Sequence, residues 1–404
     1  MSASLLYHAW GLRGYRLIGT RFEKGRVCFG IEHDAGSLRC SHCGSTRIEK
    51  FGKVPRRFRT LPIGSRPVVL ELSIQRLLCF DCGRTAQVRL GFADERRSYT
   101  RTFERYVLEL SRFMTVQDVA RHLQVGWDIV RDIQKRHLVA RYSKPKLKNL
   151  KHIAIDEISV GRGHRYLTVV LDLDSGAVVF VGKGKGADSL GQFFKRLRAS
   201  HAHVVAVATD MSPAYILAVA EHLPKALHVF DRFHVIKLFN DKLSALRREM
   251  QREAEGPLQK NVLKGTRWLL LKNPQNLDEQ RNERQRLEEA LLLNKPLATA
   301  YYLKEDLRQL WEQEGHLEAS DFLDDWMARA RASGVRMLQE FAQTLEIHRT
   351  GLLNWYFCPI STGPLEGTNT KIKLLQRQAY GYRDMEFFRL KIYAIHQTTY
   401  ALVG

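Results

Sequence analysis

The chain has 404 residues, a formal charge of +21 and a hydrophobic content of 44%. Its length suits two to three domains, and its hydrophobic content argues against a disordered protein. There is no apolar run of about 18 residues, which argues against a membrane span, and the first residues lack the pattern of a signal peptide.

The positive charge is concentrated in the first part of the chain. Residues 1–150 hold 29 lysine and arginine residues against 13 aspartate and glutamate residues, whereas residues 151–404 hold 35 against 30. A localised excess of this size predicts a polyanionic partner, and nucleic acid is the commonest one. A basic surface that serves only solubility would not need to concentrate its lysine and arginine residues in one part of the chain.

The first domain, residues 1–95, is predicted to be rich in β-strands. The segments YRLIGTRF and RVCFGIEH flank Glu23-Lys24-Gly25, which signals a hairpin. Two further segments, PVVLELSIQRLLC and TAQVRL, also have the composition of strands.

Four of the six cysteines form two CxxC pairs, and each pair is followed by a glycine. Two thiolate pairs supply the four ligands of a structural Zn²⁺, and a glycine lets the backbone turn tightly beneath the metal. The 35 residues between the pairs exceed the usual spacing of a zinc ribbon, but a β-hairpin would fill them. The predicted ligands are Cys40, Cys43, Cys79 and Cys82, whereas Cys28 and Cys358 are expected to be core thiols.

Residues 96–150 are predicted to hold a helix-turn-helix and a basic linker. A helix over Val116–Leu123 is followed by Gln124-Val125-Gly126, and a second helix starts near Trp127. Ordinary helical hairpins look alike, but the basic surroundings favour a DNA-binding motif whose second helix enters the major groove. The candidate DNA contacts on this helix are Trp127, Arg131, Gln134, Lys135 and Arg136.

Residues 151–240 alternate between strands and helices. Three strand-like segments, HIAIDEISV, RYLTVVLDLDSG and AVVFVGKG, precede a helix, a strand, a helix and a strand. This order predicts a mixed α/β sheet. Residues 241–355 lose strand character and are predicted to form an all-helical insertion. Residues 356–404 are predicted to be helical again, with a break at Tyr380-Gly381-Tyr382.

Three carboxylates occupy positions that suit a metal site. Asp156 and Asp210 end apolar strands, and Glu366 comes from a helix after the insertion. An acid at the end of an apolar strand is costly unless it is paired or bound to a metal. Three hard oxygen ligands suit Mg²⁺ or Mn²⁺, which support phosphoryl transfer. Glu157 is expected to point to the other face of its strand and is not assigned as a ligand.

Glu366 lies in the segment GPLEGTNTKIK, which begins at Gly363. Pro364 close to a first helical position predicts the start of a helix. The carboxylate would then be stabilised by the helix dipole, which is a structural alternative to metal binding for this residue. Lys371 and Lys373 follow on the same helix and are further candidate DNA contacts.

Several of these segments together resemble one family of proteins. IDEIS, TDMSPAY, VFDRFHVIKLFNDKLSALRRE and GPLEGTNTKIKLLQRQAYGYRDMEFFRLKI are similar to the transposases of the ISL-three family of bacterial insertion sequences. The paired CxxC module followed by a helix-turn-helix is similar too. The resemblance implies a ribonuclease-H-like catalytic core with an Asp-Asp-Glu triad, interrupted by a helical insertion. The triad then falls on Asp156, Asp210 and Glu366.

Two more residues remain candidates for catalysis. Asp231 and His234, in DRFH, resemble an Asp-x-x-His signature of related transposase superfamilies. His234 would contact the scissile phosphate or orient a carboxylate, and the alternative is a structural pair at the end of a strand. A triad with Asp231 as its second acid is the other arrangement that the sequence allows.

The resemblance implies a metal-dependent DNA transposase. Such a protein would bind terminal inverted repeats and target DNA, act as a dimer or higher oligomer because two DNA ends are joined, and work in the bacterial cytoplasm at the nucleoid. We expect Mg²⁺ or Mn²⁺ in the active site and a structural Zn²⁺. The rival interpretations are a DNA-binding regulator with an inactive core and a ribonuclease-H-type nuclease without strand transfer.

Overall fold

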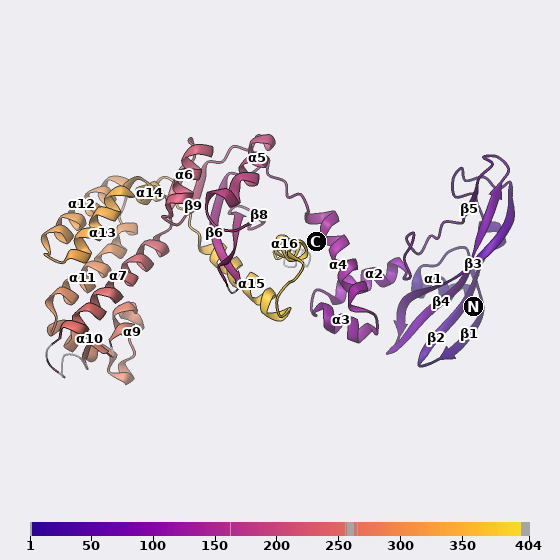
Figure 1. The fold of residues 1–404 in the computed structure, drawn as a ribbon, viewed down its shortest axis with the longest axis horizontal. Coiled ribbons are helices and arrows are strands. Elements are labelled where there is room, and N and C mark those ends of the chain that lie inside the picture. Colours follow the sequence, from indigo (N-terminus) through magenta and orange to yellow (C-terminus); the bar gives the residue numbers. More distant parts are fainter. Residues whose placement is uncertain (1, 162, 255, 257–261, 265, 397–404) are drawn as a thin grey trace. The chain divides into compact units, whose positions relative to one another are not determined.

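The computed structural model describes residues 2–161, 163–254, 256, 262–264 and 266–396 (Figure 1). The chain divides into two compact units, which we describe separately. Unit 1 consists of Met1–Ser143 and Arg377–Leu390, and unit 2 consists of Lys144–Gln376 and Lys391–Gly404. None of the helices in the described residues is both long and apolar enough to cross a membrane.

Unit 1 begins with a helix and a five-stranded sheet. The strand order is β1-β2-β4-β3, with β5 paired to β4. β2 and β4 are parallel, and the other pairs are antiparallel. The elements are α1 (Ser2–Trp10), β1 (Tyr15–Glu23), β2 (Arg26–His33), β3 (Ile48–Ile63), β4 (Arg66–Cys79) and β5 (Thr85–Gln87).

The turn between β1 and β2 is the hairpin that the sequence predicts. Glu23 pairs with Arg26, so only two residues form the loop. Lys24 and Gly25 have φ values of 49° and 75°. Positive φ at both central residues is typical of the type I′ turn, whose twist matches that of the strands beside it.

β3 is a strand that the sequence analysis did not identify. Its 16 residues include Gly52 and Pro55, both of which weaken a strand pattern. The proline is tolerated because β3 lies at the edge of the sheet, where a missing backbone N–H breaks no ladder on the open side. Together β3 and β4 form the hairpin expected between the two cysteine pairs.

One face of this sheet forms a hydrophobic core of its own. The core cluster brings residues of α1, the strands and the segment after β5 together, including Trp10, Phe29, Phe58, Leu70 and Phe92. The other face of the β2–β4–β3 region carries mostly polar and charged residues. This alternation is what a sheet with one solvated face requires.

The helix-turn-helix has the boundaries that the sequence predicts. Its helices are α2 (Arg101–Leu110), α3 (Val116–Leu123) and α4 (Trp127–Tyr142). Thr115 caps α3 by accepting a hydrogen bond from the Asp118 N–H. Gln124 ends α3 in the left-handed conformation, with φ 51°. Val119, Leu123, Val130 and Ile133 are among the buried residues that hold the three helices together.

Unit 2 contains a second five-stranded sheet, in the order β10-β9-β6-β7-β8. β6, β7 and β8 form an antiparallel meander, whereas β6, β9 and β10 are parallel. This is the mixed α/β sheet that the sequence predicts. The elements are β6 (His152–Gly161), β7 (Arg165–Asp172), β8 (Val178–Lys183), α5 (Gly191–Ser200), β9 (Ala206–Thr209), α6 (Pro213–His222) and β10 (Leu227–Phe230).

The basic segment before β6 is more than a linker. Leu147 and Leu150 are buried in the same core cluster as Phe193 of α5 and Tyr215 of α6. The lysines of this segment stay exposed while its leucines pack against the sheet, so unit 2 begins several residues before its first strand.

Between β10 and the last two helices, the described residues of regular structure are all helical. They share a second large core of unit 2, built around Phe239, Trp326 and Phe341. The helices are α7 (Arg232–Glu253), α9 (Arg267–Leu271), α10 (Glu283–Leu292), α11 (Lys295–Arg308), α12 (His316–Ala332), α13 (Arg336–Ile347) and α14 (Arg349–Leu353). α15 (Gly363–Gln378) and α16 (Met385–Tyr393) follow, separated by the predicted break, where Tyr380 and Gly381 have φ values of 51° and 94°.

Candidate functional site

Two of the predicted acids lie on neighbouring strands of the second sheet. β6 and β9 run parallel, with Ala154 opposite Ala208. Asp156 is two residues further along β6, and Asp210 is two residues after Ala208. The prediction that Asp156 ends its strand is wrong, because β6 continues to Gly161, whereas Asp210 directly follows β9. The parallel register still places the two aspartates at the same level of neighbouring strands. The negative charge of Asp210 contributes to a raised pKa at Asp156, which fits this proximity.

Asp156 is largely buried, and burial is the main cause that raises its pKa to about 6. The charges of Asp210 and Glu157 act in the same direction, whereas the Glu157 N–H and His234 act against them. Asp156 Oδ1 accepts a hydrogen bond from the Glu157 N–H at 2.7 Å. Burial and the neighbouring acid disfavour the charged form of this carboxylate, and a bound cation would stabilise that form.

α15 brings Glu366 toward Asp156. Asn369, one turn after Glu366, donates a hydrogen bond from Nδ2 to Asp156 Oδ2 at 2.9 Å. Further along, Gln376 donates to the Val160 carbonyl, so α15 lies along β6. Residues three apart on a helix share a face, and Glu366 is therefore on the side of α15 that meets the sheet. In the described residues, no hydrogen bond or ion pair engages the Glu366 carboxylate, which is half-buried.

Asp156 and Asp210 act on each other's charge, and Glu366 lies one helical turn before the Asn369 that contacts Asp156, but the three acids do not form a tight ligand cluster. Within the described ranges, the groups of possible ligand atoms that lie within 4.8 Å of one another do not include Asp156, Asp210 and Glu366 together. Carboxylates repel one another, so three of them are expected to stay apart until a cation neutralises them.

Asp231 has a different environment from these acids. It is only 3% exposed, and both of its carboxylate oxygens accept hydrogen bonds. Oδ1 accepts from the Phe233 N–H at 2.7 Å and so caps α7. Oδ2 accepts from the N–H and the hydroxyl of Thr362, at 2.6 and 2.5 Å. Asp231 thus accepts three hydrogen bonds, whereas Asp210 accepts one, from the Ser212 N–H to Oδ1 at 2.9 Å.

The Asp231–Thr362 contact joins the two ends of the helical segment. Thr362 directly precedes α15, and Asp231 directly follows β10. A second contact supports the first, because Asn354 Nδ2 donates to the His228 carbonyl at 2.8 Å. Asp231 thus fixes where α15 starts and, through α15, where Glu366 lies.

His234 lies in the first turn of α7 and is close enough to Asp156 to lower its pKa. Its Nε2 atom is buried and has no hydrogen-bond partner in the described part of the chain. An unpaired buried nitrogen is costly, so this atom is available to a hydrogen-bond partner from outside the chain. Asn369 Oδ1 is also buried and has no hydrogen-bond partner in the described residues.

The four predicted zinc ligands come together at one end of the β3–β4 hairpin. The Sγ atoms of Cys40 and Cys82 are 3.7 Å apart, and those of Cys43 and Cys79 are 3.5 Å apart. A tetrahedron with Zn–S distances of about 2.3 Å has sulfur atoms about 3.8 Å apart, so the four thiols fit a zinc ion.

The glycine after each cysteine pair has the predicted role. Gly44 and Gly83 have φ values of 75° and 66°. Each donates its N–H to the carbonyl of the first cysteine in its pair, at 3.0 and 2.9 Å. The two pairs therefore form similar tight turns, which a side chain at the glycine would strain.

The candidate DNA contacts of α4 fall into two groups. Trp127 is 43% exposed, and the Arg131 guanidinium lies over its ring, 5.2 Å from the centroid. The structure argues against the prediction that Gln134 contacts DNA. Its side chain is only 2% exposed, and its Nε2 donates a hydrogen bond to Ser111 Oγ at 2.7 Å. The residue lies on the face of α4 that packs against the other two helices, which helical spacing alone did not reveal.

Lys135 and Arg136 are engaged within unit 1. Lys135 forms ion pairs with Asp384 and Glu386 at 2.8 and 2.7 Å. Arg136 pairs with Glu104 and donates to the Tyr99 hydroxyl. On α15, by contrast, Lys371 and Lys373 are exposed.

Comparisons with known proteins give a consistent result along the chain. A family profile described as a transposase matches residues 153–392. The helix-turn-helix domain of the transposase family ISL3 matches residues 88–138, and the zinc-finger of the transposases of IS204, IS1001, IS1096 and IS1165 matches residues 37–82. The transposase for insertion sequence element IS1001 of Bordetella parapertussis is 35% identical over 368 residues, which is 90% of each chain.

The chain belongs to the ISL3 family of insertion-sequence transposases. A further relative, the transposase for insertion sequence element IS1557 of Mycobacterium tuberculosis, is 31% identical over 86% of this chain and 83% of its own. Among solved structures, the Drosophila P element transposase strand transfer complex matches with a TM-score of 0.30 and 12% identity, over 65% of this chain and 81% of the other.

The matched regions of this ISL3 transposase coincide with the sites described above. The zinc-finger match contains all four clustered cysteines, and the helix-turn-helix match contains α2, α3 and most of α4. The transposase match spans Asp156, Asp210 and Glu366. The order of zinc ribbon, helix-turn-helix and transposase core is therefore as the sequence predicts.

Sequence reasoning missed residues that support the acids. Asn369 contacts Asp156, Thr362 contacts Asp231, and the Tyr215 hydroxyl donates to Glu157 at 3.0 Å. The Tyr215 contact also shows that Glu157 faces α6, whereas Asp156 faces α15. Only the Asn369 position carries a signal in the sequence, because it follows Glu366 by one helical turn.

Replacing Asp156 with asparagine is expected to stabilise the metal-free transposase at neutral pH. Burial raises the pKa of Asp156 from 3.8 to about 6, so the folded protein holds a proton that the unfolded chain releases. The stability of the original chain should fall as pH rises from about 4 to 6 and stay low above that range. The upper limit of this penalty is about 3 kcal/mol, and an Asp156→Asn variant should escape it.

Chemical denaturation at pH 5 and at neutral pH, with a chelator present, measures this effect. Asp231→Asn is the matched control, because it removes a charge that Thr362 stabilises and should lower the free energy of unfolding at both pH values. An Asp156→Asn variant that is less stable than the original chain at neutral pH would contradict the prediction.

Proposed function

We propose that this transposase binds the terminal inverted repeats of its element, frees 3′-hydroxyl ends and joins them to target DNA. In the first step, water attacks a phosphodiester at the element end, and the bond from phosphorus to the 3′-oxygen breaks. In the second, the freed 3′-hydroxyl attacks a target phosphodiester, and one target 3′-oxygen leaves. Each step exchanges one P–O bond for another and needs no oxidant or reductant.

The observation that carries this proposal is the contact between Asn369 and Asp156. It joins α15, with Glu366 on the same face, to β6, whose parallel neighbour β9 is directly followed by Asp210. Three acids from separate parts of the sequence thus approach one edge of a sheet. A helix cap or a lysine partner would explain one such acid, but it would not explain all three in one place.

The residues at this edge fit divalent cations. Asp156 is costly to ionise alone, the Glu366 carboxylate makes no ion pair in the described residues, and Asn369 offers a buried, unpaired oxygen. We assign Asp156, Asp210 and Glu366 as the ligands of Mg²⁺ or Mn²⁺. Such ions activate the attacking oxygen and stabilise the leaving oxygen in phosphoryl transfer.

Other residues of the chain would hold and orient the DNA and the acids. His234, with its unpaired Nε2, is suited to donate to a phosphate oxygen, and Asp231 holds α15 in place through Thr362. Lys371 and Lys373 would contact the DNA backbone beside the acids. Trp127 and Arg131 would contact end DNA from the helix-turn-helix, and the four clustered cysteines would bind a structural Zn²⁺.

We further propose that unit 2 is a ribonuclease-H-like core interrupted by the helical segment. The support is the sheet, in which an antiparallel meander is followed by two parallel strands, and the hydrogen bonds that join Asp231 to Thr362 across that segment. Because transposition joins two DNA ends, we expect a dimer or a larger assembly when ends are bound.

Incubation with Mg²⁺ and duplexes bearing the element's ends tests the proposed function. We expect products with 3′-hydroxyl ends at the element boundary and, with a plasmid present, element ends joined to it, both identified by sequencing. Binding without cleavage would favour a regulator with an inactive core. Cleavage without joining, also when a precut 3′-hydroxyl end is supplied, would favour a nuclease without strand transfer.

A further inference from the structure

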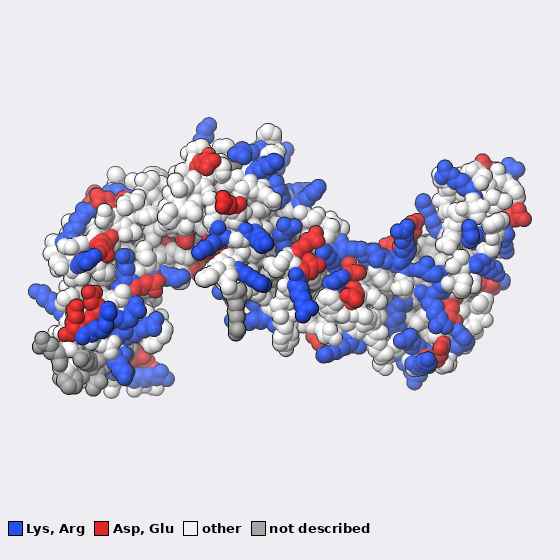
Figure 2. Space-filling model, viewed as in Figure 1, with Lys and Arg blue, Asp and Glu red and all other residues white. Residues whose placement is uncertain are grey.

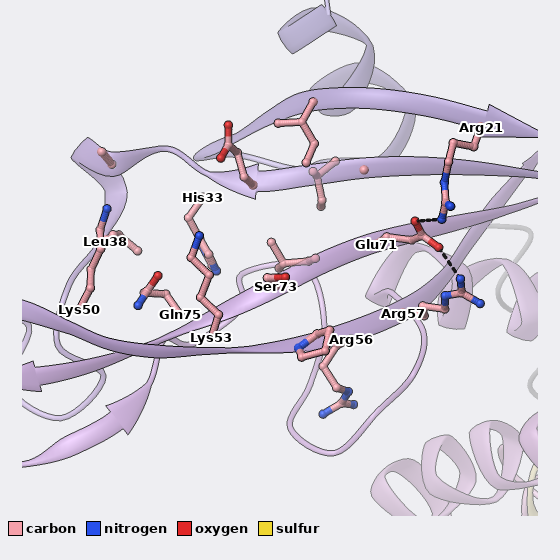
Figure 3. A pocket seen from close by; sticks show the side chains of 17 residues that line it. Arg21, His33, Leu38, Lys50, Lys53, Arg56, Arg57, Glu71, Ser73 and Gln75 are labelled. Atoms are coloured by element: carbon pink, nitrogen blue, oxygen red, sulfur yellow. Dashed lines mark hydrogen bonds and ion pairs between the residues drawn. The ribbon is translucent and has the colours of Figure 1, made fainter.

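A groove of about 620 Å³ opens on the N-terminal sheet, outside the zinc cluster and the helix-turn-helix (Figure 3). It forms where two parallel strands part. β2 pairs with β4 only from Val27 to Ile31, opposite Val68 to Leu72. β4 then continues beside β3 as far as Cys79, whereas β2 ends at His33. We call this depression the β3 groove, because β3 supplies most of its cations.

The β3 groove is positively charged. Five cationic residues and two carboxylates line it, namely Arg21, Lys50, Lys53, Arg56 and Arg57 with Glu32 and Glu71. Each carboxylate is already neutralised by arginine. Glu71 pairs with Arg21 and Arg57 at 2.5 and 2.8 Å, and Glu32 pairs with Arg16 at 2.5 Å. His33 adds little to the positive charge, since burial lowers its pKa and favours the neutral ring.

In the described residues, Lys50, Lys53 and Arg56 of the β3 groove make no ion pair, but Arg56 donates a hydrogen bond to the Arg97 carbonyl, so the free cations are the two lysines. Both side chains are exposed, and in the described residues neither makes a hydrogen bond or an ion pair. In Figure 3 they lie with His33 at one end of the groove, and the Arg21–Glu71–Arg57 cluster lies at the other. The unpaired ammonium groups therefore lie at one end of the groove, where an anion can bind them.

A β-bulge puts the two lysines on one face. Residues 50 and 53 of a regular strand would point to opposite faces. Here Lys50 pairs with Leu77 and Lys53 pairs with Gln75, so three steps on β3 match two steps on β4. Gly52 absorbs the extra residue with φ 124°. Bulges re-aim side chains in this way, and this one brings Lys50 to the face of Lys53 and Arg57.

The cations of this face form a track rather than a pocket for a small anion. From Lys53 to Arg57 the strand rises about 13 Å, and Lys50 extends the row further. Successive phosphates of one DNA strand are about 3.4 Å apart along the helix axis, so the row spans several phosphates. Lysine acts as a point charge without a fixed hydrogen-bond geometry, which suits a backbone and not a base edge.

We propose that the β3 groove binds the phosphodiester backbone of duplex DNA and adds sequence-independent affinity beside the helix-turn-helix. The inference rests on the proposed function, because it assumes that duplex DNA is the partner of this chain. Figure 2 shows lysine and arginine side chains over the part of unit 1 that carries the sheet. The segregation of 29 cationic against 13 acidic residues in residues 1–150 fits a second DNA contact in this unit.

The test uses the full chain with Lys50→Gln and Lys53→Gln combined. Affinity is measured over a series of salt concentrations for two probes, a duplex with the element's end and a mixed-sequence duplex. We expect affinity for both probes to fall by about 10-fold or more at low salt. The slope of log affinity against log salt should become shallower by about two, one for each lost phosphate contact.

The matched control is a chain with Arg66→Gln and Arg89→Gln. These exposed arginines belong to the same unit, and neither lines the groove, so the charge change is equal. Both variants should keep the zinc content and melting temperature of the original chain. Unchanged affinity and slope in the lysine variant, an equal loss in the control, or a loss confined to the end duplex would each overturn the proposal. If the original chain binds neither duplex, the proposed function itself fails, which is a distinguishable result.

Discussion

A Glu366→Gln variant is expected to lose DNA cleavage and strand transfer by about 1000-fold or more while it still binds end DNA. The substitution keeps the size of the side chain but removes the charge that attracts a divalent cation. Positioning and charge neutralisation supply nearly all of the catalysis in phosphoryl transfer, so the loss should be large. If Glu366 only complements the helix dipole, cleavage should persist and stability should drop by about 0.3–1 kcal/mol.

Cleavage of end DNA at saturating Mg²⁺, measured beside a binding assay, decides between these outcomes. Asp156→Asn and Asp210→Asn should give losses as large as Glu366→Gln, because each removes one ligand. Glu157→Gln should be milder, since Glu157 faces Tyr215. These three comparisons test the acids of the triad as a set.

Asp231→Asn separates the two arrangements of acids that the sequence allows. Asp231 accepts three hydrogen bonds from Phe233 and Thr362, so its loss should lower stability and displace α15 in part. If Asp210→Asn cleaves nearly normally while Asp231→Asn is inactive at unchanged stability, the second acid is Asp231, and the triad assigned above is wrong.

Removal of zinc is expected to unfold the end of unit 1 that carries the cysteines. One zinc per chain should be present in freshly purified protein, and Cys79→Ser should abolish its binding. Zinc binding contributes an apparent 10–16 kcal/mol to the folding of small zinc modules. Among the described residues, no core cluster includes the turns at Gly44 and Gly83, whereas the sheet keeps the cluster around Trp10 and Phe58.

Metal analysis and proteolysis of the variant measure this effect, since an unfolded ribbon should be cleaved near the cysteine pairs first. Cys28→Ser is the matched control. Cys28 is buried but lies outside the four-cysteine cluster, so its variant should retain zinc. Purified protein without zinc, or a Cys79→Ser variant with an intact ribbon, would show that the cysteines serve another purpose.

The sequence was informative where the signal is local. The turn at Lys24-Gly25, the end of α3 and the break at Gly381 each depend on residues a few positions apart. So does the paired CxxC pattern, since two short turns and a hairpin suffice to bring four thiols together. In such cases the backbone preferences of the residues involved already specify most of the geometry.

The sequence misled where the answer depended on which side of an element is buried. Gln134 has the spacing of a recognition-helix residue, but it lies against Ser111. β3 was missed because Gly52 and Pro55 disrupt its alternation, yet one of them creates the bulge that aligns two lysines. Helical or strand periodicity defines faces, but it does not say what packs against each face.

By itself, the sequence determined the order of the modules, the four cysteines that cluster and the family to which the chain belongs. Only the tertiary structure decided how the acids relate to their neighbours. The Asp231–Thr362 contact spans 131 residues and the Asn369–Asp156 contact spans 213. The physical reason is that closing loops of this length is repaid only by the packing of whole elements. The packing of β10, α7 and α15 therefore decides which acid accepts hydrogen bonds from the protein and which is left for a cation. No single motif decides this.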